Sequence, residues 1–170
     1  MGDIRVLCEA CEKGKFIVNK CLKNGYDINT EKLEKLLIIM QGEMLRLYRK
    51  PFFLQPIIVN DKDVIIPKVE DSFSMYNDGF KERLCEYYHL TKEDQEIMDM
   101  VFASYAQMDI NDLNEKREIN ILKSLYIENE WGLNIISNDQ IKNIFIRSRF
   151  FENDFIKPNH NVKQKVLAIK

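Results

Sequence analysis

The side chains best suited to chemistry in this sequence are cysteine thiols and histidine imidazoles. Cys8 and Cys11 form a Cys-x-x-Cys pair, and Cys85 and His89 stand four positions apart, as two ligands on one helical turn would. The four side chains could hold zinc, because thiolate and imidazole are its usual ligands. Cys8 and Cys11 alone have the spacing of a redox-active dithiol. A third alternative is a cysteine enzyme in which His89 activates Cys85.

Core packing explains these cysteines better than metal binding or catalysis does. Cys8, Cys11 and Cys21 follow one apolar stripe at helical spacing. A free cysteine in a cytosolic protein is usually a small buried hydrophobe, and no third residue is apparent that would orient His89 beside Cys85. The motifs of phosphate-binding loops, nucleophile elbows and zinc proteases are missing from the sequence. We therefore expect no zinc, no disulfide, no cofactor and no catalytic residue, and we expect that the protein is not an enzyme.

Aromatic and arginine side chains form a second group of candidates, suited to binding another protein. Interfaces favour Trp, Tyr, Phe and Arg as anchors. Phe52 and Phe53 are adjacent, so in an extended segment they would point to opposite faces, and one of them could be exposed. Trp131 precedes a glycine in a connection before the last predicted helix. The predicted partner-binding residues are Arg46, Arg49, Phe52, Asn60, Asp61, Asp63 and Trp131.

A long helix has to position several of these residues. From Thr30 to Lys50, apolar residues recur at intervals of three and four, which is the period of an α-helix. Asn29 or Thr30 can cap its first turn, and Pro51 ends it because proline disfavours the helical region at the preceding residue. Other apolar residues fall outside the main stripe, so we expect a central helix buried on several sides. The stripe consists of Leu33, Leu36, Leu37, Met40, Met44, Leu47 and Tyr48.

A small β-structure is predicted directly after the central helix. Two short apolar runs, 55–59 and 64–66, flank the polar turn Asn60–Asp63 and are expected to pair as strands. Pro67 suits the first turn of a helix, because that position needs no backbone N–H donor. The turn therefore joins the two strands of a hairpin, and a short helix follows the second strand.

Most of the remaining sequence predicts helices. A first helix is expected over 3–23 and another over about 110–127, whose charged residues 115–118 are expected to face solvent. Capping boxes at Thr91–Asp94 and Ser137–Gln140 predict two more helix starts. The predicted fold class is α+β, predominantly α-helical, in a single compact domain with a central buried helix and a small β-hairpin or sheet. A length of 170 residues suits one domain, 1–170, and 152–170 is expected to be a polar tail or a short terminal strand.

The order KLxKLLxxxQGxxLxLYxKPFFxxPI, followed by VIIPKVxxxF, resembles the Panacea domain family of antitoxins, which includes SocA- and GepA-like proteins. That family shows a helix ending in Gln-Gly, a (Y)G(R/K)PLF corner, a short strand and a Val-Val-Pro segment that opens another helix. Here Asn60, Asp63 and Val64 stand where members usually carry Trp and Gly-Pro. The resemblance implies neutralisation of a cognate toxin by direct protein–protein binding. The residues on the family pattern are Gln41, Gly42, Tyr48, Pro51, Phe53, Pro56, Ile66, Pro67, Val69 and Phe73.

Composition and charge narrow the possible partners. Hydrophobic residues make up 45% of the chain and charged residues 31%, as in globular domains. The net charge of −2 does not supply the cationic face that nucleic-acid binding usually needs. No apolar run approaches the roughly 18 residues that cross a bilayer, and the N-terminal stretch lacks the features of a signal peptide. We expect a cytoplasmic protein whose partner is a cognate toxin or defence protein, with no membrane and no direct nucleic-acid binding.

Two alternatives to a toxin-neutralising antitoxin remain on the same fold. The protein could be a phage- or prophage-encoded inhibitor of a host defence enzyme, because Panacea-like domains are frequent in mobile elements. An amino-acid composition rich in Asn, Ile and Lys also suggests an AT-rich genome. It could also be an adaptor that delivers a toxin to a protease, as related members do. An enzyme built on Cys8, Cys11, Cys85 and His89 is the alternative from another functional class.

Overall fold

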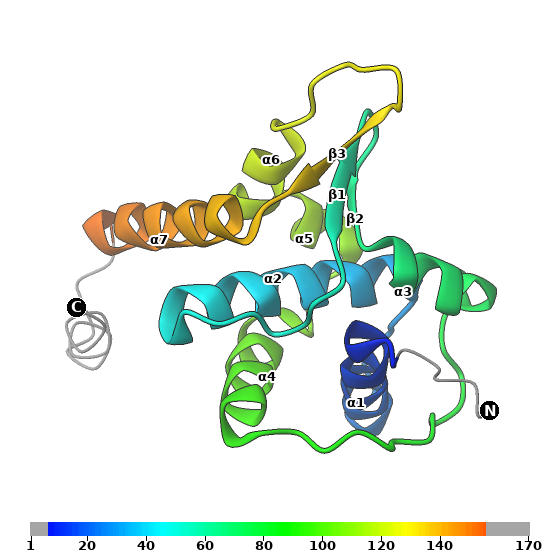
Figure 1. Cartoon of the computed structure of the whole chain (residues 1–170). Helices are drawn as coiled ribbons and strands as arrows, with labels where there is room; N and C mark the ends of the chain where they lie inside the picture. Colours follow the sequence, from blue (N-terminus) through cyan, green and yellow to red (C-terminus); the bar gives the residue numbers. More distant parts are fainter. Residues whose placement is uncertain (1–6, 156–170) are drawn as a thin grey trace, which may run out of the picture.

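The computed structural model describes residues 7–155, which form a bundle of helices with a small sheet at one end (Figure 1). The element at its centre is α2, Thr30–Tyr48. The helix is buried along nearly all of its length and packs against α1, α3, α4, α5 and α7. This arrangement confirms the predicted fold class, a predominantly helical α+β domain around a buried central helix.

Both ends of α2 follow from local sequence. The Asn29 side chain accepts a hydrogen bond from the Lys32 N–H at 2.8 Å, which satisfies one of the free donors of the first turn. At the other end Arg49 adopts the left-handed conformation, with φ 59°, and Pro51 follows. A non-glycine residue with positive φ is uncommon, and here it turns the chain sharply into the segment that leads to the sheet.

The other helices lie on two sides of α2 (Figure 1). On one side are α1, Glu9–Lys23, and α4, Lys92–Tyr105; on the other is α7, Asn138–Phe155. The predicted capping boxes at Thr91–Asp94 and Ser137–Gln140 are both present as reciprocal hydrogen bonds. Since α7 continues to Phe155, 152–155 is helical, and the rest of the predicted tail lies outside the described residues.

The sheet has three antiparallel strands in the order β2-β1-β3. The predicted hairpin is confirmed as β1, Ile57–Asn60, and β2, Val64–Ile65, followed by α3, Pro67–Ser72, and the short 3-10 helix η1, Ser74–Tyr76. The third strand, β3, Leu133–Ile136, was not predicted and pairs with β1 so that Ile58 faces Ile135. The buried face of the sheet consists of Ile57, Val59, Val64 and Ile136.

The helix predicted over 110–127 is instead two short helices. α5 spans Ile110–Asn114 and α6 spans Arg117–Lys123, because Lys116 adopts an extended conformation between them. The prediction that the charged residues 115–118 face solvent is wrong for Glu118, which is buried and forms an ion pair with Arg149 of α7 at 3.3 Å.

The expectation of free cysteines is wrong for one pair, because Cys8 and Cys11 form a disulfide. Cys8 is the N-cap of α1 and Cys11 lies three residues later, so the first turn brings their Cα atoms to 5.2 Å, within the range that a disulfide spans. Cys21 is free and buried, and burial raises the pKa of its thiol to about 11. Cys85 is free and exposed.

Candidate interaction surface

Phe52, predicted as a partner contact, lies in the core instead. Phe52 and Phe53 are both completely buried, so the expectation that one of the two rings is exposed is wrong. The cause is the buried side chain of Gln41, whose Oε1 accepts hydrogen bonds from the N–H groups of Phe52 at 2.6 Å and Phe53 at 3.1 Å. Its Nε2 donates to Phe53 O at 3.1 Å and to Asn138 Oδ1 at 3.3 Å. Gln41 thus ties the corner after α2, and the start of α7, to the central helix.

Arg46 is also used within the fold. Its guanidinium is paired with the Glu43 carboxylate: Glu43 Oε2 lies 2.6 Å from Arg46 Nη2 and 2.8 Å from Arg46 Nε. The Arg46 side chain is only 12% exposed. The same carboxylate pairs with Arg149 of α7, which donates to the Tyr105 hydroxyl at 2.8 Å. Burial lowers the pKa of Arg149, but the charges of Glu43 and Glu118, the hydrogen bond to Glu43 and the nearby Tyr105 together outweigh burial, and the pKa is raised overall. Arg149 therefore stays charged, and the cluster links α2, α4 and α7.

Two of the three predicted turn residues are used to build the turn. Asn60 Oδ1 accepts hydrogen bonds at 2.8 Å from the N–H groups of both Lys62 and Asp63. Asp63 Oδ2 pairs at 2.7 Å with the ammonium of Lys35, a fully buried side chain of α2. Asp61 is exposed at the tip. The departure from the family pattern at Asn60 and Asp63 therefore serves the fold, because it supplies the turn and a partner for a buried cation.

Lys35 has a second acidic neighbour, Glu34, which is also buried. Glu34 Oε2 accepts the Ile66 N–H at 3.0 Å, and its other oxygen lies 3.6 Å from the Lys35 ammonium. Burial raises the pKa of Glu34 to about 8, and the attraction of Lys35 only partly offsets this. The carboxyl is consequently protonated in the folded protein over part of the neutral range.

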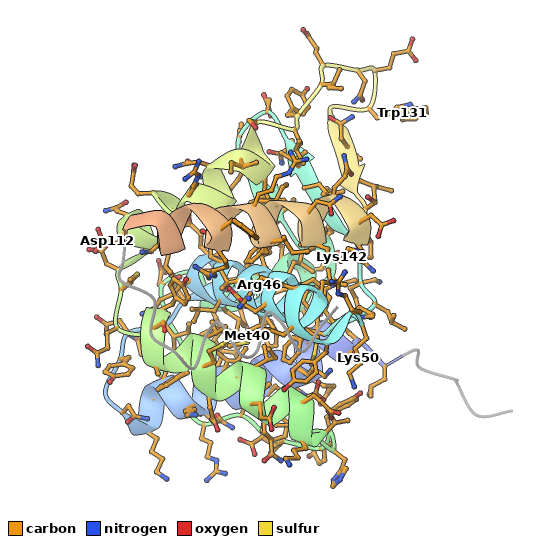
Figure 2. The ribbon with its side chains drawn as sticks, turned by 90° about the vertical axis from the view of Figure 1, so that its left-hand side faces the viewer. Met40, Arg46, Lys50, Asp112, Trp131 and Lys142 are labelled. Atoms are coloured by element: carbon orange, nitrogen blue, oxygen red, sulfur yellow. A yellow bond between two sulfur atoms is a disulfide. The ribbon has the colours of Figure 1, made fainter. Side chains whose placement is uncertain are left out.

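The predicted contacts that remain exposed do not share one surface. Trp131 is 81% exposed in the connection that leads into β3, and Asp61 is near it because Asn60 pairs with Leu133. Arg49 is exposed at the C-terminal end of α2. In Figure 2 its neighbour Lys50 is well separated from the tryptophan. The predicted surface thus divides into two parts.

Several large apolar side chains besides Trp131 are exposed on and beside β3, and sequence reasoning missed most of them. Alternate residues of β3 face outward, so Leu133 is 39% and Ile135 is 69% exposed. Ile127 is 71% exposed and is placed beside the strand because its N–H donates to the Asn134 side chain at 2.8 Å. We call Ile127, Trp131, Leu133 and Ile135 the β3 surface. Its sequence signal was the run LNII before the Ser137 cap, which has strand composition but only four residues.

A mixed cleft of about 740 Å³ opens on the other side of the molecule, between α1, α4 and the segment that contains Arg83 and Leu90. Its apolar walls include Phe16 and Phe102, and one ion pair crosses it, with Lys20 Nζ 2.5 Å from Asp99 Oδ1.

Within 7–155, no group of three or more His, Cys, Asp or Glu side chains is arranged to hold a metal ion. None of the helices in the same part of the chain is long and apolar enough to cross a membrane. The comparisons with family models, with curated proteins and with solved structures found no match, so the resemblance to the Panacea domain stays a prediction.

Proposed function

We propose that this chain is an antitoxin-like protein that neutralises a cognate toxin by direct binding, and that the β3 surface is where the toxin binds. The observation that carries the proposal is the exposure of four large apolar side chains on and beside one edge strand. Clustered exposed apolar side chains on a soluble domain commonly mark interaction sites, and tryptophan is among the residues that most often anchor interfaces.

The surroundings of the β3 surface indicate the character of the partner. The turn between β1 and β2 and the connection before β3 carry three exposed acidic residues, Asp61, Glu128 and Glu130. They carry one exposed cation, Lys62. A partner with an apolar patch bordered by basic side chains would complement this surface, since charges at an interface rim favour encounter and exclude wrong partners. Inhibition of this kind is stoichiometric and needs no catalytic residue, and we propose that it occurs in the cytoplasm.

The open edge of β3 suits the same role. In the order β2-β1-β3, the strand pairs with β1 on one side only. Part of the other side is occupied, because the Asn129 amide donates to Leu133 O at 2.9 Å. An edge strand whose outward residues are apolar is a common place for another chain to add. The edge and the apolar side chains therefore favour the same binding site.

Site-specific cross-linking in the native host tests where the partner binds. A photo-reactive amino acid, p-benzoyl-phenylalanine, replaces Trp131 in one tagged variant and Met75 in the other. Met75 is 78% exposed in η1, away from the sheet, and is the matched control. We expect one protein to be cross-linked through position 131 and not through position 75. Equal cross-linking at both positions, or none at 131, would rule out the β3 surface.

The antitoxin role is tested with the cross-linked protein itself. Expressed alone, it should arrest growth, and co-expression of the wild-type chain should restore growth. The variant Trp131→Ala/Ile135→Ser should restore growth poorly while remaining folded. A cross-linked protein that causes no arrest, such as a defence enzyme or a protease component, would contradict the antitoxin proposal in favour of one of the alternatives on the same fold.

A further inference from the structure

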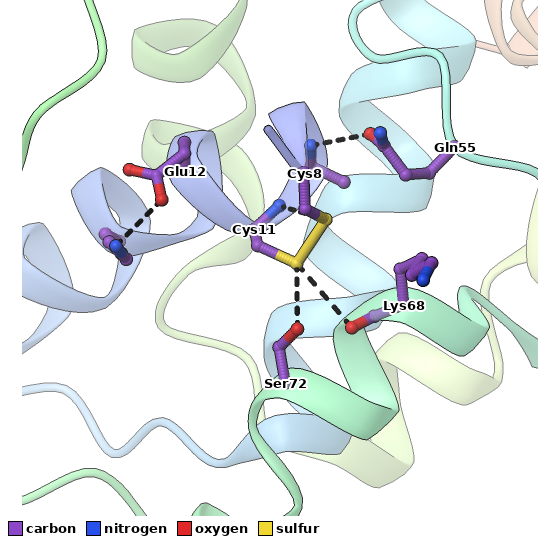
Figure 3. The surroundings of a disulfide bond; sticks show 8 residues. Cys8, Cys11, Glu12, Gln55, Lys68 and Ser72 are labelled. Carbon is purple, nitrogen blue, oxygen red and sulfur yellow. Dashed lines mark hydrogen bonds and ion pairs between the residues drawn. A yellow bond between two sulfur atoms is a disulfide. The ribbon is translucent and has the colours of Figure 1, made fainter. Parts of the chain in front are cut away.

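The first turn of α1 carries two cysteines of unequal accessibility. Cys8, the N-cap, is partly exposed, whereas Cys11 is 5% exposed and faces α3 (Figure 3). Cys11 Sγ lies 3.3 Å from Ser72 Oγ and 3.6 Å from Lys68 O, both of which belong to α3. Cys8 is therefore the more accessible of the two cysteines to a thiol or disulfide from solution, while Cys11 is held in the α1–α3 contact.

The surroundings of Cys8 stabilise a negative charge on its sulfur. The Cys11 N–H points at Cys8 Sγ at 3.3 Å, and it is one of the backbone donors that a helix N-terminus leaves without a partner in the helix. The two acidic residues of the same turn are paired, Glu9 with Lys13 at 3.2 Å and Glu12 with Lys15 at 2.8 Å. Their ion pairs reduce the repulsion that they would exert on a thiolate, which is the reactive form of cysteine.

The Cys8–Cys11 disulfide does not connect distant parts of the chain. It joins residues three positions apart, so it restrains the unfolded chain far less than a bond closing a long loop would. Residues of the same turn are already held together by the helix, and the turn is fixed further by the Ala10 N–H, which donates to Gln55 Oε1 at 2.8 Å. A structural cross-link at this position would add little to the stability of the fold. A disulfide that forms and breaks reversibly needs two sulfurs this close together.

From these observations we infer that Cys8 and Cys11 are a thiol–disulfide exchange site, which reacts reversibly with low-molecular-weight thiols and disulfides of the glutathione class. In the oxidising direction the Cys8 thiolate attacks one sulfur of glutathione disulfide, and the glutathione S–S bond breaks. One glutathione thiolate leaves, and Cys8 forms a mixed disulfide. The Cys11 thiolate then attacks Cys8 Sγ and releases the second glutathione thiolate.

The reaction balances without another oxidant. Two protein thiols are oxidised to one disulfide, one glutathione disulfide is reduced to two thiols, and the two protons pass from Cys8 and Cys11 to the released thiolates. The exchange also changes the α1–α3 contact. A Cys11 thiol can donate its proton to Lys68 O, whereas the disulfide has no proton to donate and can only accept from the Ser72 hydroxyl.

Titration of the full chain in glutathione buffers tests the inference. After equilibration at each ratio of thiol to disulfide, the free thiols are alkylated with a maleimide reagent and counted by intact mass. The experiment uses a Cys85→Ser background, because Cys85 is exposed and would react as well. We expect Cys8 and Cys11 to change together, from two alkylated thiols to none, at a reproducible glutathione ratio, while Cys21 stays reduced because it is buried. A protein that keeps one form at every ratio would overturn the proposal.

The assigned order of attack is tested with two single variants in the same background. Cys11→Ser should accumulate the mixed disulfide of Cys8 with glutathione, since no second thiol can release it. Cys8→Ser should form much less mixed disulfide at Cys11, because that sulfur is buried against α3. Circular dichroism checks that both variants are folded. Equal accumulation in the two folded variants, or none in Cys11→Ser, would contradict these roles.

Discussion

Gly42 of α2 lies directly under the aromatic ring of Phe145 of α7. A Cβ atom added at Gly42 would overlap three atoms of the ring, which is itself completely buried. Only glycine lets the two helices approach this closely. The Gln-Gly pair in the central helix is thus explained by two neighbouring contacts: Gln41 holds the corner after α2, and Gly42 admits the ring from α7.

Gly42→Ala should destabilise the fold. The new methyl group must displace the Phe145 ring in a packed core, and such overpacking typically costs about 1–3 kcal/mol. The gain in helix propensity from glycine to alanine, up to about 1 kcal/mol, offsets part of this loss. The free energy of unfolding, measured by urea denaturation, should therefore fall.

Gly14→Ala is the matched control, because Gly14 is also a buried glycine inside a helix. A Cβ there would lie 3.5–3.6 Å from Leu33 and Leu37, at ordinary contact distance. This variant should be as stable as wild type or more stable by about 0.5–1 kcal/mol. If both alanine variants shift stability in the same direction by the same amount, the close approach of α2 and α7 is not as described.

Gln41→Leu should destabilise the protein strongly. The substitution leaves the N–H groups of Phe52 and Phe53 buried without their acceptor. Each buried unsatisfied group costs about 1–3 kcal/mol, so a total loss of roughly 2–5 kcal/mol is expected. The control is Gln107→Leu. The Gln107 amide donates to the Tyr26 hydroxyl at an exposed position, so loss of this hydrogen bond should change the stability by at most about 0.5 kcal/mol. Similar unfolding midpoints for the two variants would contradict the role of Gln41.

The stability of the protein should decrease with increasing pH because of Glu34. Burial raises the pKa of this carboxyl from its ordinary 4.5 to about 8 in the folded state. Between these two values the folded chain binds a proton that the unfolded chain has lost. The contribution of Glu34 to stability is therefore full below about pH 4.5 and is lost as the pH rises towards 8.

Glu34→Gln removes that dependence, because the amide does not ionise and can still accept from the Ile66 N–H. Across this window the wild type should lose up to about 1.4 kcal/mol per pH unit relative to the variant. Chemical denaturation at pH 5 and pH 8 measures the difference. Glu115→Gln, at an exposed position directly after α5, should follow the wild-type curve much more closely. Parallel curves for wild type and Glu34→Gln would show that this carboxyl ionises normally in the folded protein.

The central helix, its caps and the hairpin could be predicted from sequence because each depends on nearby residues. Asn29 and Thr91 cap helices through side chains three positions from their partners, and Pro67 starts α3 through its own ring. β3 could not be predicted in the same way, because four residues carry little periodic signal and its pairing partner, β1, is more than seventy positions earlier. The break at Lys116 is followed by a buried Glu118 paired with Arg149 of α7, a contact between distant residues that the local sequence does not reveal.

The candidate site was predicted only in part for a related reason. Trp131 and Asp61 were correctly placed on the surface, but exposure of Arg46 and Phe52 is decided by distant partners. Arg46 is adjacent to a carboxylate shared with α7, and Phe52 is held inward by Gln41. Residue type alone cannot reveal such contacts between elements. The disulfide was missed because the same helical spacing that suits a packed stripe also brings Cys8 and Cys11 within bonding reach.

Loss of the Trp131 side chain should affect binding and not folding. Because the ring is 81% exposed, Trp131→Ala should keep the thermal unfolding midpoint of the wild type within a few degrees. Anchoring residues typically contribute about 1–3 kcal/mol to binding when truncated to alanine, and this should be lost with the ring. Binding through the β3 surface predicts that Arg49→Ala, at the C-terminal end of α2, leaves binding unchanged, whereas the expectation from sequence predicts weaker binding.

The most direct measurement is the Kd of the cross-linked partner for the purified wild type, for Trp131→Ala/Ile135→Ala and for Met75→Ala, by isothermal titration calorimetry. Binding through the β3 surface predicts that the double variant weakens the Kd by about tenfold or more, equivalent to at least 1.4 kcal/mol, while Met75→Ala binds as the wild type does. A folded double variant with the wild-type Kd, or an equal loss in Met75→Ala, would contradict the account.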